Sequence, residues 1–95
     1  MANMKMKSSD TAATGTVSAT KALVRSVTLT PAAAVATLVL RDGGAGGTVL
    51  LRLQAAANGN SQTWGDGESV LVCATDIHVT IGGAGANVNV GYQPE

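Results

Sequence analysis

The sequence predicts an all-β protein, a small antiparallel β-sandwich or jelly-roll-like barrel with an extended N-terminal arm. From Gly15 onward, short segments rich in Val, Thr, Leu and Ile are separated by glycine clusters at intervals of roughly 8 to 12 residues, as antiparallel strands are. The chain has 95 residues, 45% of them hydrophobic, which is enough for one domain. About seven or eight such strands bury one face each most compactly as two packed sheets.

Residues 1–14 are expected to form the arm, and residues 15–95 the sandwich domain. The first 14 residues hold three methionines, two lysines and a polar mixture without a sustained period. A segment with so little apolar surface needs a neighbouring molecule to hold it. The candidate contacts of the arm to another subunit or partner protein are Met4, Lys5, Met6 and Lys7.

The first strands of the sandwich are expected over residues 15–20 and 21–30. The first of these carries the weaker pattern. The second is clearly apolar but has imperfect faces, because Leu23 and Val27 share a parity with Arg25 whereas Val24 has the opposite one.

A hairpin is expected next, from an apolar run over residues 36–40 and another over 48–53, with a glycine-rich turn between them. A helix is the alternative for both runs, since Pro31 follows a possible Thr30 N-cap and residues 49–57 include good helix formers. We favour strands, because the first run is rich in β-branched residues.

The C-terminal third is expected to contribute strands over residues 61–64, 69–74, 77–81 and 87–92. In the last two, apolar and polar residues alternate strictly. The glycines at 82, 83 and 85 allow the positive φ angles of a tight turn. The sequence therefore predicts that residues 77–81 and 87–92 form an antiparallel hairpin.

The sequence contains no recognisable catalytic motif, and we expect a non-enzymatic protein without cofactor or metal. His78 is the sole histidine, and Asp76 lies two residues before it, but no nucleophile or second metal ligand accompanies them. We expect His78 to face solvent. The glycine clusters lack the lysine and hydroxyl of a phosphate-binding loop and are expected to be turns.

Two single residues have more than one interpretation. Cys73 lies in an apolar run and is expected to be a small core residue. Trp64 lies in a polar, glycine-rich stretch with Asp66 and Glu68. It could pack in the core, anchor a subunit interface, or stack on a sugar whose hydroxyls the two acids bind.

Charge and composition limit the partners. Six basic residues balance six acidic ones, so we expect neither nucleic-acid binding nor attraction to an anionic membrane. No apolar run approaches the roughly 20 residues of a membrane span or suggests a signal peptide, so synthesis in the cytoplasm is expected. Without phenylalanine, the core removes little apolar area per residue, and we expect stability to depend on neighbouring subunits.

Residues 21–92 resemble a family of small structural proteins of tailed bacteriophages. The resemblance lies in an apolar strand leading to a Thr-Pro-Ala turn and in several short motifs. These are Ala-Thr-Leu-x-Leu-x-Asp-Gly at 36–43, Gly-Thr-Val-Leu at 47–50, Ile-x-Val-Thr-Ile-Gly-Gly at 77–83 and Val-x-Val-x-Tyr at 88–92.

The resemblance implies a virion protein, assembled in the host cytoplasm. It implies a capsid decoration or cement protein that stabilises the phage head as a homo-oligomer, with a trimer favoured. The partner would be the major capsid protein or another virion protein, and no functional residues carry over. A carbohydrate or host-surface binding module associated with a tail or head fibre is the alternative.

Overall fold

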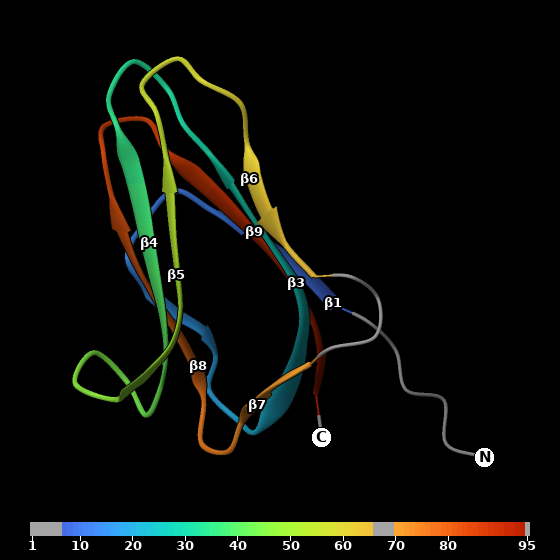
Figure 1. Ribbon diagram of the computed structural model, residues 1–95. Coiled ribbons are helices and arrows are strands. Elements are labelled where there is room, and N and C mark those ends of the chain that lie inside the picture. The colour runs from blue at the N-terminus through green and yellow to red at the C-terminus, as the bar shows by residue number, and fades with distance from the viewer. Residues whose placement is uncertain (1–6, 66–69, 95) are drawn as a thin grey trace.

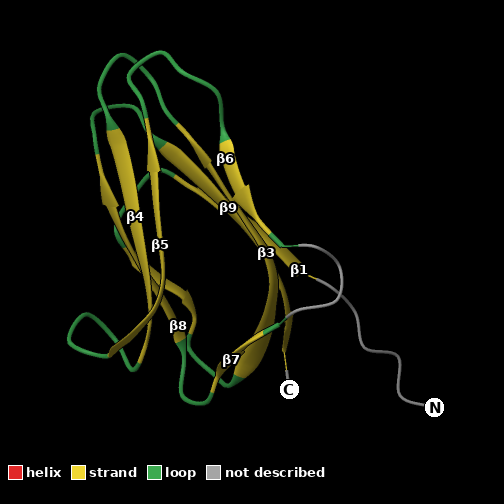
Figure 2. Ribbon diagram, in the orientation of Figure 1, coloured by secondary structure: helices red, strands yellow, loops and turns green. Residues whose placement is uncertain are grey.

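The computed structural model describes residues 7–65 and 70–94, and these form two β-sheets packed face to face (Figure 1). The described residues contain no helix (Figure 2). The small antiparallel β-sandwich expected from the sequence is therefore confirmed. The strands are β1 (Lys7–Thr11), β2 (Gly15–Ser18), β3 (Ala22–Thr30), β4 (Ala36–Asp42), β5 (Thr48–Ala55), β6 (Gln62–Trp64), β7 (Leu71–Cys73), β8 (Ile77–Gly82) and β9 (Asn87–Pro94).

The two sheets contain five and four strands. The first has the order β1-β9-β3-β6, with β7 also pairing with β3, and the second has the order β2-β8-β4-β5. All pairings are antiparallel. β6 and β7 pair with opposite ends of the same edge of β3, so together they form one interrupted edge strand.

Between the sheets lies a core of aliphatic side chains. It is built from alternate residues of the central strands, as the period-two pattern predicts. The largest side chains that are fully buried are Val24, Val27, Leu29, Leu38, Leu40, Cys73, Ile77, Val79, Val88 and Val90. Tyr92 is the one aromatic residue among the buried described residues, and it is 9% exposed.

A β-bulge explains the imperfect faces of β3. The register between β3 and β9 shifts between Val24 and Ser26, so Arg25 is an extra residue in β3. Val24 and Val27 are both fully buried, although an odd separation of three residues would place them on opposite faces of a regular strand. Because of the bulge, Val27 and Leu29 in the second half of β3 face the core, as Val24 does in the first half.

The bulged Arg25 is held by the neighbouring strand and lies where the edge strand is interrupted. Its Nε donates a hydrogen bond to Gln93 Oε1 at 2.6 Å, and Gln93 is only 7% exposed. Gly65, which directly follows β6, has φ +128°, and a Cβ there would lie 2.6 Å from the carbonyl oxygen of Arg25. A side chain at residue 65 would therefore separate β6 from the bulge.

The hairpin expected between residues 77–81 and 87–92 is wrong. β8 pairs with β2 and β4, whereas β9 pairs with β1 and β3, so the two strands belong to different sheets. The glycine turn carries the chain across the sandwich. Gly83 has φ +101° and packs so closely on the carbonyl oxygen of Val35 that no side chain fits.

The expected arm needs a correction of its boundary. Residues 7–11 are not an extension: they form β1, which pairs with β9 along its full length and is the edge of the first sheet. Residues 1–6 lie outside the described part of the chain. The hairpin between residues 36–40 and 48–53 is confirmed as β4–β5, and the helical alternatives are not found.

Candidate functional site

One side of the sandwich, which we call the open flank, is apolar and only partly covered. β5 is an edge of the second sheet and β6 lies at an edge of the first (Figure 1). A few Cα atoms of β5 come within 8 Å of Cα atoms of β6. β7 continues the edge of β6. The open flank consists of the half-buried side chains of Leu51, Leu53, Trp64 and Leu71.

The position of these residues at the edge strands explains their exposure. Leu51 and Leu53 pair with Leu40 and Leu38 of the adjacent strand β4, and both β4 residues are fully buried. Likewise, the edge residues Trp64 and Leu71 are half-buried, whereas their partners on β3, Val27 and Val24, are fully buried. The four side chains point into the same core, but no further strand covers them among the described residues.

The backbone of β5 contributes a second unsatisfied feature. Among the described residues, β5 pairs only with β4, so the N–H and C=O groups along its other side have no strand partner. β5 is eight residues long and contains no proline. Long, apolar edge strands are sites where another chain adds a strand.

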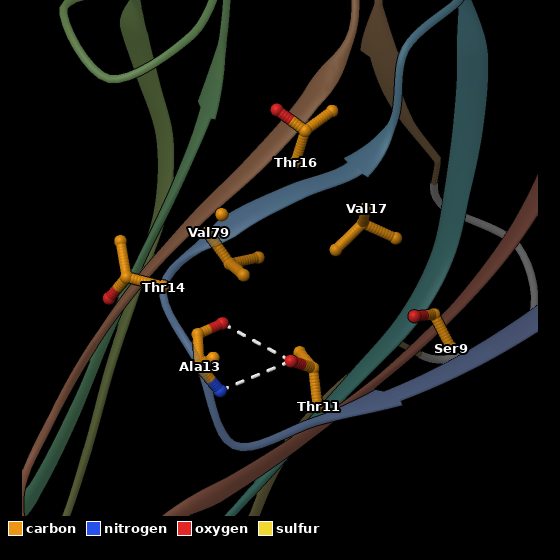
Figure 3. Close-up of a pocket in the computed structure, with 8 residues that line it drawn as sticks. Ser9, Thr11, Ala13, Thr14, Thr16, Val17 and Val79 are labelled. Carbon is orange, nitrogen blue, oxygen red and sulfur yellow. Dashed lines mark hydrogen bonds between the residues drawn. The ribbon is translucent and has the colours of Figure 1, made fainter.

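The opposite side of the sandwich is polar. There the inward positions of β1 are occupied by Ser9 and Thr11, whose partners Val90 and Val88 are fully buried. A hollow of about 250 Å³ lies between β1 and β2, with Val79 among the residues that line it (Figure 3). Hydroxyl groups occupy most of the positions that correspond to the leucines of the open flank, and Val17 of β2 is the partly buried apolar side chain among the residues that line the hollow.

The chain itself bridges the two sheets on this polar side. After β1, residues 12–14 cross to the second sheet. Thr11 Oγ1 accepts a hydrogen bond from the N–H of Ala13 at 3.1 Å, in a local turn (Figure 3). Thr14 Oγ1 accepts one from the N–H of Ile81 at 2.9 Å. The two sides of the sandwich therefore differ in polarity and in the chain crossing that only the polar side has, and the open flank is the stronger candidate for an apolar partner.

Of the site residues expected from the sequence, Trp64 lies on the open flank. Its side chain is half-buried and packs against the core, so its packing and interface interpretations agree with its position. Asp66 and Glu68 lie outside the described residues. Lys7 begins β1, where it is paired with Tyr92. Met4, Lys5 and Met6 also fall outside the described part.

Two aspartates tie together the loops at one end of the sandwich. Asp42, at the end of β4, accepts hydrogen bonds from the N–H groups of Ala74 (3.0 Å), Thr75 (2.9 Å) and Asp76 (3.4 Å). The bonds from Thr75, and next those from Ala74, hold the pKa of Asp42 below its ordinary value, against a smaller effect of burial. The loop between β7 and β8 is therefore fixed to the end of β4.

Cys73 is a fully buried core residue, as expected. Burial raises the pKa of its thiol to about 11, and the negative charges of Asp42 and Asp76 add to the effect. The thiolate is therefore scarce at neutral pH, and Cys73 has none of the features of a reactive cysteine.

The expectation that His78 faces solvent is wrong. β8 is a central strand, and the cross-strand neighbours of His78 are Thr16 and Arg41, which leave its side chain 8% exposed. Its Nδ1 is buried and has no hydrogen-bond partner among the described residues. Asp76 does not orient it, since Asp76 Oδ1 accepts instead from the backbone N–H groups at residues 43 and 44.

The described residues place no three His, Cys, Asp or Glu side chains close enough to hold a metal ion. Within the same ranges, no helix has the length and hydrophobicity to cross a membrane. No protein-family model matches the chain, and comparisons with curated proteins and with solved structures found no significant match.

Sequence reasoning pointed to Trp64 but missed the leucines of the open flank. The alternation in residues 48–55 identifies a strand, but it gives no indication that the strand lies at an edge. An indirect signal is the leucine-rich character of β5, which carries three leucines in eight residues and yet buries only its last residue, Ala55.

Proposed function

We propose that this protein is a non-enzymatic structural protein of a bacteriophage virion, a decoration or cement protein that binds the outer capsid surface as a homo-oligomer. The observation that carries the proposal is the open flank, an apolar surface beside an unpaired strand edge. Such a surface favours association with another protein over the monomeric state. The sequence resemblance to phage structural proteins supplies the context of the virion.

The fold suits this role physically. A capsid presents the same site many times, so a small oligomer can gain avidity from several weak contacts. Residues that stay half-exposed in the monomer, such as Leu51 and Trp64, gain burial on assembly. Assembly would then add to the stability of a domain whose core lacks phenylalanine.

Two measurements test the proposal. Size-exclusion chromatography with light scattering should give a closed oligomer, with a trimer favoured. The purified protein should also cosediment with heads of the phage that encodes it and saturate at a fixed ratio to the capsid protein. A monomer that does not bind heads at any concentration would contradict the proposal. Cryo-electron microscopy of the particle would then locate the protein on the virion.

A glycan-binding role is the second candidate, because Trp64 is only half-buried. An exposed indole face can stack on a sugar ring. Binding on a glycan array that is lost in Trp64→Ala, while the thermal stability of the variant stays sufficient for folding, would favour this candidate over a capsid role.

A further inference from the structure

We propose that residues 1–6 of one copy bind the open flank of a second copy, adding a strand to the free edge of β5 and placing Met4 and Met6 over its leucines. The proposal deepens the proposed function, since it rests on the homo-oligomer and identifies the contact that forms it.

The sequence before β1 has the pattern that this surface requires. Met4, Lys5, Met6 and Lys7 alternate apolar and cationic residues. In an extended segment, successive side chains point to opposite sides, so the two methionines share one face and Lys5 takes the other. A strand at a sandwich edge needs one apolar side toward the core and one charged side toward solvent. Methionine is also flexible enough to fill an irregular apolar surface.

The short stretch of chain between the two methionines and β1 favours a contact between copies. Six extended residues reach about 20 Å, which matches most of the length of β5. Within one copy, β1 lies at the opposite edge of the first sheet from β6, with β9 and β3 between them. Crossing three strand spacings takes about 14 Å, whereas Met4 is three residues from Lys7 and can lie at most about 10 Å from it, so Met4 and Met6 do not reach β5 of their own copy. A second copy has no such constraint.

The two sides of the sandwich also favour the open flank as the receiving surface. The polar side already has the crossing of residues 12–14 and the hydrogen bonds of Thr14. The open flank offers both unpaired backbone groups on β5 and half-buried leucines. A bound strand would satisfy the backbone and cover Leu51 and Leu53 in one step.

The charges give the association a definite salt dependence. Arg52 lies on the outer face of β5, since its partner is Val39 and the inward positions are Leu51 and Leu53. With the methionines facing inward, Lys5 lies on the same outer face as Arg52. Because like charges on one face repel, screening by added salt should strengthen the association.

Trp64 makes the proposal measurable, because it is the only tryptophan and lies on the open flank. In the full chain, dilution should convert a larger species to a monomer and shift the tryptophan emission to longer wavelength, with stronger acrylamide quenching. A variant lacking residues 2–6 keeps all of β1. It should be monomeric at every concentration, with the emission of the dissociated form and unchanged far-ultraviolet circular dichroism.

A peptide with the sequence of residues 1–7 provides the direct test. Added to the variant lacking residues 2–6, it should shift the emission to shorter wavelength and protect Trp64 from acrylamide. The same peptide carrying Met4→Asp and Met6→Asp should do neither, and Lys5→Gln should retain binding. In the full chain, Met6→Asp should abolish association whereas Lys5→Gln should not.

The outcomes separate this contact from the capsid role. If the variant lacking residues 2–6 keeps the mass and emission of the full chain, the arm contact is wrong while a homo-oligomer persists by another surface. If the emission depends on residues 1–6 but the full chain is a monomer at all concentrations, the segment binds its own copy and the exchange between copies is wrong. Cosedimentation with phage heads tests the proposed function independently of either result.

Discussion

Asp42 and Asp76 each accept backbone hydrogen bonds from the segment that contains the other. Asp42 receives three N–H groups from residues 74–76, and Asp76 Oδ1 receives those of Gly43 and Gly44 at 2.9 and 3.0 Å. The turn after β4 and the loop before β8 are thereby joined by five bonds to two carboxylates. Because residues 74–76 connect the first sheet to the second, this pair fixes how the sheets meet at this end.

The lowered pKa of Asp42 predicts a loss of stability in acid. The folded pKa lies below the ordinary value of 3.8, so the unfolded chain takes up a proton first as the pH falls. The contribution of Asp42 is therefore complete above about pH 4 and is lost as the pH falls through the folded pKa. Asp42→Asn should lower the melting temperature at pH 7, and its difference from the wild type should shrink below about pH 4. A difference that is constant from pH 7 to pH 2.5 would contradict this explanation.

Cys73 should be unreactive in the folded protein. A pKa of about 11, compared with an ordinary 9.0, lowers the fraction of thiolate about a hundredfold at pH 8, and the fully buried side chain adds a steric barrier. The reaction with a disulfide reagent such as DTNB should therefore be slow in buffer and fast in concentrated urea. Equal rates in both conditions would show that the thiol is accessible in the folded state.

Leu38 and Ile81 are paired on the inward face of the second sheet and should differ in their contribution to stability. Leu38 is fully buried in the core, at 0% exposure, whereas Ile81 is only half-buried. Leu38→Ala should cost about 2 to 5 kcal/mol, and Ile81→Ala should fall at or below the lower end of that range. Urea denaturation of both variants measures the difference, and a larger cost at Ile81 would contradict the observed packing.

Removing only Arg25 from its hydrogen bond with Gln93 should cost more stability than replacing both partners by apolar residues. Arg25→Ala leaves the Gln93 amide oxygen without its donor in a side chain that is 7% exposed, at a cost of about 1 to 3 kcal/mol. Removing both partners in Arg25→Ala with Gln93→Leu should restore part of that loss. A double-mutant cycle in urea measures the coupling. Additive effects would show that the bond contributes nothing to the stability of the bulge.

The sequence predicted the strands well because alternation is a local property. Residues 36–42 and 87–94 form strands close to the expected bounds, and the hairpin β4–β5 follows from its glycine-rich turn. The bulge at Arg25 was visible only as a break in parity. A broken parity indicates an irregular strand but does not reveal which residue is extra.

Strand pairing was the part that the sequence could not determine. Glycine with positive φ at residue 83 serves a hairpin and a crossing between sheets equally well. The choice depends on which strands the ends meet, and those partners lie far away in sequence. The same reasoning explains why the open flank was missed, since the edge position of β5 follows from the order of all the strands.

The pairing of β1 with β9 has a consequence for how the protein forms. Lys7 meets Tyr92 and Thr11 meets Val88, so about 80 residues separate the partners of this ladder. β4–β5 is the only pair of consecutive strands that is joined as a hairpin within the described residues. Closing such long loops is slow, and β1 has no partner strand until β9 has been synthesised. In the nascent chain, β1 and the edge of β3 that later receives β9 therefore stay unpaired, and accessible to chaperones, while all the intervening strands are made.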